Sequence, residues 1–114
     1  MGLAQVYLVT KQPGKAQKVL NRALEILPED AEIRTWLGLS YIRGNRLEEG
    51  LEEIMQAVQS DPYYLPAYFY LGLYLSESDS SKARKYLDYF LNRVAGDSRF
   101  KNMEQKAREL LNKL

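Results

Sequence analysis

The residues whose spacing comes closest to acid–base chemistry are four carboxylates in the middle of the chain. Glu48, Glu49, Glu52 and Glu53 follow one another at intervals of one, three and one residues. A helix would place them on its outward side, with no histidine and no pocket-forming neighbours beside them. Catalytic carboxylates need environments that push their pKa values apart. The pattern therefore favours a solvated helix face over a catalytic or metal site.

The composition removes most other catalytic and metal-binding groups. The chain of 114 residues contains no cysteine and no histidine. This excludes disulfides, thiolate nucleophiles, zinc sites built from Cys or His, and the usual general base at neutral pH. The sequence also holds no glycine-rich phosphate loop, nucleophile–base pair or cofactor motif. We therefore expect a protein that is not an enzyme and that uses no cofactor and no metal.

Aromatic and basic residues offer a second kind of chemistry, because rings stack on bases and cations pair with phosphates. The chain has nine tyrosines, and Lys82, Arg84 and Lys85 form a basic segment. Acidic residues such as Asp88 and Asp97 interrupt the later cations, and the formal net charge is only +1. Such mixed charges on helices usually form a solvated face. We therefore expect no nucleic-acid partner. No apolar run is long enough for a membrane span, so we expect no membrane insertion.

Apolar residues recur at helical spacing through the whole chain, and no useful stretch alternates as a strand would. Seven helices are predicted, over residues 3–11, 15–27, 31–43, 47–60, 64–77, 82–95 and 99–114. Asp30 and Ser80 are predicted to cap the helices that follow them. Gly44 and Asn45 end the third helix and readily take the left-handed conformation. The predicted class is all-α, with each helix antiparallel to the last.

A fixed offset of 34 residues organises these helices into repeats. Five pairs of identical residues share it, namely Leu37/Leu71, Gly38/Gly72, Leu39/Leu73, Ala23/Ala57 and Pro28/Pro62. The glycines would let the two helices of a unit approach closely, and the alanines would do the same between units. The prolines would end the second helix of each unit.

This pattern resembles the tetratricopeptide repeat, a helix–turn–helix unit of 34 residues. The matching residues cover about residues 1–95: Ala4-x2-Tyr7, Ala16-x3-Leu20, Leu37-Gly38-x2-Tyr41, Gly50-x3-Ile54, Tyr68-x2-Leu71-Gly72-x2-Leu75 and Ala83-x3-Leu87. The resemblance implies a right-handed α-solenoid of antiparallel helix pairs. Its units would span about residues 1–30, 31–64 and 65–97, with a capping helix over 99–114.

Several positions depart from the family pattern. Arg34 stands where a large aromatic residue is expected, Trp36 follows two residues later, and Gly50 replaces the usual alanine. Phe90 replaces a small residue in the last unit, as expected for a unit that packs against the capping helix. The first helix lacks its opening turn and an N-cap. We therefore expect the chain to be a fragment of a longer protein, with a naturally short start as the alternative.

The resemblance also implies a concave groove lined by the first helix of each unit. The aligned positions are Gln5, Leu8, Val9, Glu32, Thr35, Trp36, Leu39, Ile42, Arg43, Pro66, Phe69, Tyr70, Leu73, Ser76 and Glu77. Most are apolar or aromatic, and Trp36, Phe69 and Tyr70 have the composition of binding hot spots. Trp36 and Leu39 stand where family members that hold a peptide carboxylate use polar residues. The aromatic residues could instead belong to the core or be covered by a missing N-terminal part.

The function expected from this resemblance is protein–protein binding. The protein would be a scaffold or adaptor that docks an apolar peptide or amphipathic helix in the groove, with Trp36, Ile42, Phe69 and Leu73 accessible. The alternative is a structural segment whose groove packs against its own missing N-terminal part or against a second copy. The two differ in size in solution, since the first predicts a monomer and the second a homo-oligomer.

Overall fold

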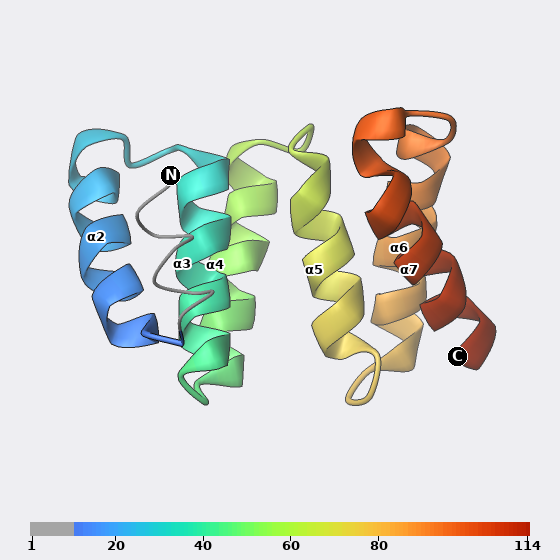
Figure 1. Ribbon diagram of the computed structural model, residues 1–114, viewed down its shortest axis with the longest axis horizontal. Coiled ribbons are helices and arrows are strands. Elements are labelled where there is room, and N and C mark those ends of the chain that lie inside the picture. Colours follow the sequence, from blue (N-terminus) through green and yellow to red (C-terminus); the bar gives the residue numbers. More distant parts are fainter. Residues whose placement is uncertain (1–10) are drawn as a thin grey trace. The chain divides into compact units, whose positions relative to one another are not determined.

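The computed structural model describes residues 11–114, and within this range every regular element is a helix (Figure 1). The elements are α2 (Pro13–Ile26), α3 (Ala31–Arg43), α4 (Leu47–Ser60), α5 (Leu65–Leu75), α6 (Ser80–Val94), the short 3₁₀ helix η1 (Ser98–Phe100) and α7 (Lys101–Lys113). The predicted all-α class is confirmed. The helix predicted over residues 3–11 lies outside the described residues.

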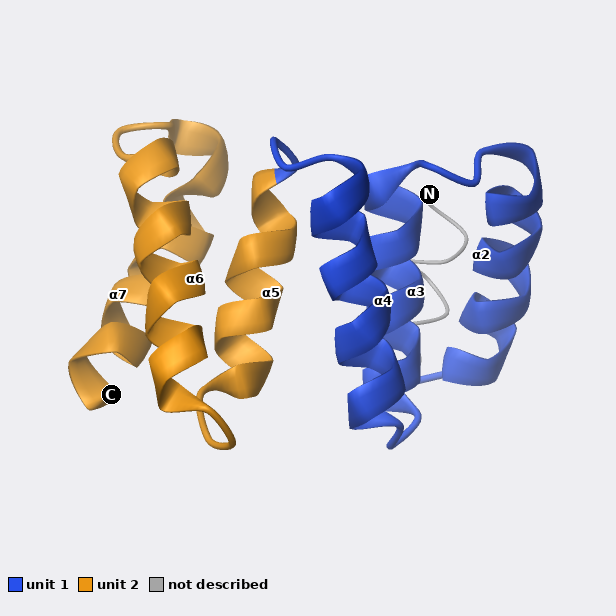
Figure 2. Ribbon diagram, turned by 180° about the vertical axis from the view of Figure 1, so that it is seen from behind, with its two compact units in different colours: residues 1–64 blue, residues 65–114 orange. Residues whose placement is uncertain are grey.

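The chain forms two compact units, residues 1–64 and residues 65–114 (Figure 2). The described helices of the first unit are α2, α3 and α4, and those of the second are α5, α6 and α7. In each unit consecutive helices pack against each other. The finer division into repeats over 1–30, 31–64 and 65–97 stays a prediction.

Carboxylates cap two of the α-helices, and one of these caps was predicted. The Asp30 side chain accepts a hydrogen bond from the backbone N–H of Ile33 at 2.9 Å, as predicted. The prediction of Ser80 as a cap is wrong, because Asp79 takes this role and accepts from the N–H of Lys82 at 3.1 Å. A carboxylate that is already charged binds the free N–H groups of a helix more strongly than a hydroxyl does.

At two other helix boundaries the structure differs in detail from the prediction, and local backbone chemistry explains both differences. The second predicted helix begins at Pro13 rather than Lys15, because proline fits the first turn, where its missing N–H has no acceptor to serve. After α3 the left-handed conformation is taken by Asn45, at φ 66°, while Gly44 stays at φ −89°. Asparagine tolerates this region better than most residues that carry a Cβ atom.

The first unit has its core between α2 and α3 and a tight contact between α3 and α4. Ala16 and Leu20 of α2 pack with Ile33 and Leu37 of α3, and all four are buried. Between α3 and α4 the predicted close approach at Gly38 is present. A Cβ atom added there would lie 2.6 Å from the carbonyl oxygen of Gly50.

Arg34 links α3 to α4 at the position where the family pattern expects an aromatic residue. Its Nη1 donates to Glu53 at 2.9 Å and to Gln56 at 3.1 Å, and its Nη2 donates to the carbonyl of Pro28 at 3.0 Å. The guanidinium thus spans the turn before α3 and one face of α4. A polar cross-link replaces the apolar contact that an aromatic side chain would make.

In the second unit, the contact at Gly72 differs from the contact at Gly38 in the first unit. A Cβ atom added to Gly72 would lie 2.5 Å from Cδ2 of Leu87 on α6. The predicted close approach of α5 and α6 therefore involves the Leu87 side chain at Gly72 rather than a second backbone. Phe90 lies beside it, fully buried, with its ring 6.1 Å from that of Phe100 in an edge-on contact.

Helix α7 is the last helix of the second unit. It packs against α6 and α5, and Ala107 is its buried residue. The guanidinium of Arg84 on α6 donates to the carbonyl of Leu114 at 2.8 Å and holds the end of α7 in place. The larger apolar residues of α7 are half-buried, and most of its charged residues are exposed. The helix therefore has one apolar and one polar side, as predicted for a cap.

Candidate functional site

On α3 the partly accessible groove positions are Glu32, Trp36 and Arg43. Spacings of four and seven residues place them on one side of the helix. Glu32 and Arg43 are exposed, and Trp36 is half-buried against the apolar cluster of α2 and α3. The indole Nε1 of Trp36 is buried and has no hydrogen-bond partner among the described residues. Packing rather than hydrogen bonding therefore holds the indole ring.

Three other predicted positions on α3 point inward. Thr35 and Leu39 are buried, with 1% and 3% of their surfaces exposed. Ile42 faces α4, since a Cβ atom added to Gly50 would lie 2.5 Å from Cγ1 of Ile42. Gly50 has no side chain, so it leaves room for Ile42 between the helices. Their contribution to a ligand surface stays a prediction.

On α5 the residue that we expected to be most accessible is a core residue. Phe69 is 6% exposed, and its ring lies 5.6 Å from that of Phe90 on α6. The expected exposure of Phe69 is wrong, because α6 offers a large aromatic ring where the family pattern has a small residue. Phe69 supports the neighbouring ring of Tyr70, whose centroid lies 5.3 Å away in an edge-on contact.

Pro66, Tyr70 and Leu73 are three of the half-exposed residues of α5, and we call them the α5 strip. Their spacings of four and three residues put them on one helix face. All three are half-buried, and Glu77 follows them as an exposed residue just beyond the helix. Ser76, also a predicted site residue, donates through its hydroxyl to the carbonyl of Leu73 at 2.8 Å. The predicted positions Gln5, Leu8 and Val9 lie outside the described residues.

An aromatic stack in the second unit was not among the predicted sites. The rings of Tyr68 on α5 and Tyr89 on α6 stack with centroids 4.2 Å apart. The guanidinium carbon of Arg93 lies 3.4 Å from the centroid of the Tyr89 ring. Burial, together with a hydrogen bond to Tyr89, raises the pKa of Tyr68 to about 12. The spacing of Tyr86, Tyr89 and Arg93 along one helix was the available signal.

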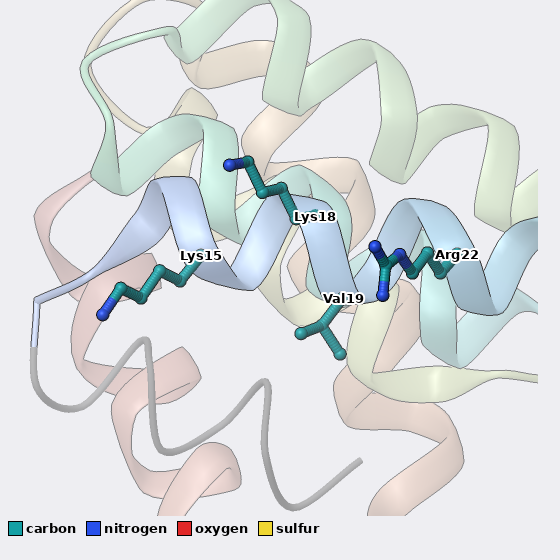
Figure 3. A pocket seen from close by; sticks show the side chains of 4 residues that line it. All are labelled: Lys15, Lys18, Val19 and Arg22. Atoms are coloured by element: carbon teal, nitrogen blue, oxygen red, sulfur yellow. The ribbon is translucent and has the colours of Figure 1, made fainter.

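A hollow on α2 was also not among the predicted sites. It has a volume of about 190 Å³ and is lined by Lys15, Lys18, Val19 and Arg22 (Figure 3). Figure 3 shows the amino groups of Lys15 and Lys18 pointing away from each other. The cations therefore do not converge on one point, as an anion site would require.

Two further tests concern metals and membranes. Over residues 11–114, no group of three or more Asp or Glu side chains is arranged to hold a metal ion. In the same range, no helix combines the length and the apolar character needed to cross a bilayer. The carboxylates of α4 are instead engaged in part with basic residues. Glu49 pairs with Arg46, and Glu53 pairs with Arg34.

Comparison with protein families identifies the repeat. Two models, both described as tetratricopeptide repeat, match residues 1–40 and residues 31–64. The chain belongs to the tetratricopeptide repeat family. The matches cover the first compact unit, and the resemblance drawn from the 34-residue offset is confirmed.

Curated relatives of this tetratricopeptide repeat chain are much longer proteins. A peroxisomal targeting signal receptor of Candida albicans is 32% identical over 73 residues, which cover 64% of the chain and 12% of the receptor. The TPR repeat-containing thioredoxin TTL4 of Arabidopsis thaliana is 32% identical over 74 residues, 64% of the chain and 11% of that protein. The chain thus matches only about a ninth to an eighth of the length of these relatives.

Solved structures share the tetratricopeptide fold. The Yersinia enterocolitica type III secretion chaperone SycD, in complex with a peptide of the translocator YopD, has a TM-score of 0.88 at 15% identity, covering 98% of this chain and 86% of SycD. MamA of Desulfovibrio magneticus RS-1 has a TM-score of 0.73 at 29% identity, covering 83% and 55%. The likeness to SycD is one of fold alone, given its low identity.

Proposed function

We propose that this protein is a non-enzymatic scaffold that binds an apolar peptide or an amphipathic helix. The observation that carries the proposal is the α5 strip, formed by Pro66, Tyr70 and Leu73 on one side of α5 and left half-exposed. Amphipathic helices dock through apolar anchors at spacings of three, four and seven residues. A strip with the same periodicity offers contacts to successive anchors.

The packing of Phe69 beneath the α5 strip favours the binding of a ligand. Phe69 packs on Phe90 in the core and makes an edge-on contact with Tyr70. A side chain that is already held in place loses little conformational entropy when a ligand covers it. Tyrosine is also among the residues enriched in binding hot spots. Tyr70 is therefore the main anchor in this proposal, and Leu73 is its apolar neighbour.

Trp36 is proposed as a separate contact, on the first unit. It is half-buried, and its ring rests on the cluster of α2 and α3. The neighbouring Glu32 and Arg43 are exposed and could pair with charged residues at the ends of an apolar peptide. The relatives agree with this class of function, since SycD is known in complex with a peptide and one relative is a targeting signal receptor.

A random-peptide display library selected on the full chain tests the proposal. We expect enriched peptides with apolar residues at helical spacing. Binding of the best synthetic peptide should weaken by about 2 kcal/mol for Tyr70→Ala, as for a hot-spot residue. The matched control is Leu47→Ala, which removes an exposed apolar residue of α4 that is not part of the α5 strip.

Two outcomes would count against the binding of apolar peptides to the α5 strip. The selection could yield no apolar peptides, or their affinity could be unchanged in Tyr70→Ala and Leu73→Ala. If the chain instead forms a dimer that dissociates on Leu73→Ala, the α5 strip would belong to contacts between copies. Sedimentation of the wild type and of this variant separates the two possibilities.

A further inference from the structure

Helix α6 has a face made only of basic and aromatic residues. The face consists of Lys82, Lys85, Tyr86, Tyr89 and Arg93, and we call it the basic face. Spacings of three, four, seven and eleven residues keep all five on one side of the helix. The three cations are exposed and the two tyrosines are half-buried. No acidic residue lies among these positions.

The basic face is held rigid by the second unit itself. Tyr89 stacks on Tyr68 at 4.2 Å, Tyr86 lies 6.3 Å from Tyr68, and Arg93 stacks on Tyr89 at 3.4 Å. Tyrosine and arginine dominate binding hot spots, and side chains fixed in advance lose little entropy on binding. The face therefore suits a partner that offers carboxylates.

The first unit offers such carboxylates on α4. Between Leu47 and Ser60 this helix carries four glutamates and no basic residue. Glu48 and Glu52 are exposed, lie one turn apart and make no ion pair within residues 11–114, whereas Glu49 and Glu53 are already paired. Met55 lies on the same side and is half-buried. We call Glu48, Glu52 and Met55 the acidic face.

Acidic and basic residues are also distributed unevenly along the chain, with acidic residues prevailing in its first part and basic residues in its second part. The first unit, residues 1–64, contains nine acidic and seven basic residues, whereas the second, residues 65–114, contains nine basic and six acidic residues. Their formal charges are therefore −2 and +3. Opposite potentials of this kind steer association and fix its register.

We propose that the basic face of α6 in one copy docks on the acidic face of α4 in a second copy of this chain. Lys82 and Lys85 lie one turn apart on α6, as Glu48 and Glu52 do on α4, so two ion pairs form side by side. Since each copy carries both faces, association closes into a dimer or continues head to tail.

Sedimentation velocity of the full chain tests this proposal through a charge exchange. The wild type should self-associate at low salt and dissociate at about 1 M salt, where the Debye length falls to about 3 Å. Glu48→Lys/Glu52→Lys should weaken association at least about tenfold, because like charges would then face each other. Lys82→Glu/Lys85→Glu should do the same. Mixing the two variants should restore association, because opposite charges face each other again.

The matched control for the glutamate reversal is Glu25→Lys/Glu109→Lys, which makes the same change in net charge at exposed residues off both faces. It should leave association unchanged. A wild type that stays monomeric at low salt overturns the proposal, as does a dimer insensitive to both reversals. A monomer whose melting temperature falls on reversal would assign the pairing to a single chain and also overturn it. Association lost on Leu73→Ala but kept in both reversals would assign the contact to the α5 strip instead.

Discussion

Gly38 and Gly50 face each other across the contact between α3 and α4. A Cβ atom on Gly38 would lie 2.6 Å from the carbonyl oxygen of Gly50, and one on Gly50 would lie closer still to the carbonyl of Gly38. Real Cβ atoms essentially never approach a backbone oxygen this closely. The contact therefore requires glycine at both positions, although only Gly38 belongs to the repeated pattern.

The first prediction concerns this glycine pair. Gly38→Ala and Gly50→Ala should each lower the free energy of unfolding by about 1–3 kcal/mol, because a fixed backbone has to shift in both cases. Urea denaturation measures the effect. The double variant should lose less than the sum, since one displacement of α4 accommodates both methyl groups.

Gly14→Ala provides the control for this experiment. Within residues 11–114, no atom outside its own stretch of helix lies within 4 Å of a Cβ added to Gly14, although the residue is also helical. Alanine is the better helix former, so this variant should be unchanged or more stable by up to about 1 kcal/mol. If Gly38→Ala behaved in the same way, the close approach of α3 and α4 would be disproved.

The second prediction separates a backbone contact from a side-chain contact. At Gly72 the neighbour is the side chain of Leu87 rather than a backbone oxygen. Gly72→Leu should overpack the contact and lower stability by about 1–3 kcal/mol. Leu87→Ala in the same chain should recover part of that loss, because it vacates the space. Thermal melts of the two single variants and the double variant check for this coupling, and strict additivity would contradict it.

The helices were predictable from sequence because their signals are local. Apolar spacing and breakers such as Pro28 and Pro62 act within a few residues, and the predicted helix over 31–43 agrees with α3 to the residue. The errors also have local causes. Ser80 was chosen as a cap where the stronger acceptor, Asp79, stood one position earlier.

The candidate site was less predictable because burial depends on residues distant in sequence. Phe69 was aligned with a ligand position, yet its exposure is decided by Phe90, 21 residues later. Ile42 is drawn toward α4 because Gly50 has no side chain. Trp36, Ile42 and Leu73 are half-exposed, and no sequence signal distinguished them from the buried Phe69.

The third prediction concerns the capping helix. Removal of residues 99–114 takes away Phe100, which packs edge-on against the fully buried Phe90. The newly exposed apolar surface should cause aggregation or unfolding. Light scattering and the melting temperature report both. Lys106→Ala/Glu109→Ala changes only exposed residues of α7 and should have little effect, within about 0.5 kcal/mol. An equally stable and soluble 1–98 fragment would show that α7 is an appendage.

The fourth prediction follows from the buried Tyr68 hydroxyl. The pKa of Tyr68 is raised to about 12 in the folded chain by burial first and by its hydrogen bond to Tyr89 second. In the unfolded chain a tyrosine has a pKa of about 10 and releases its proton earlier as pH rises. The stabilisation is therefore complete below about pH 10 and is lost as the pH rises toward 12.

Urea denaturation of the wild type and of Tyr68→Phe across this pH range tests the assignment. The variant has no proton to release at this position, so its stability should fall less steeply between about pH 10 and pH 12. At neutral pH it should be less stable by about 1 kcal/mol through the lost hydrogen bond. Equal slopes for the two proteins would contradict a raised pKa at Tyr68.

The last prediction distinguishes the two proposed surfaces by their response to salt. The α5 strip is apolar, with Tyr70 and Leu73 as its main contacts, so the affinity of a peptide selected on it should change little with ionic strength. Association through Lys82 and Lys85 should weaken steeply, because salt screens exposed charges. Peptide binding and sedimentation, measured in the same salt series, make the comparison within one protein. A peptide affinity that collapses with salt would move the ligand from the α5 strip to the basic face.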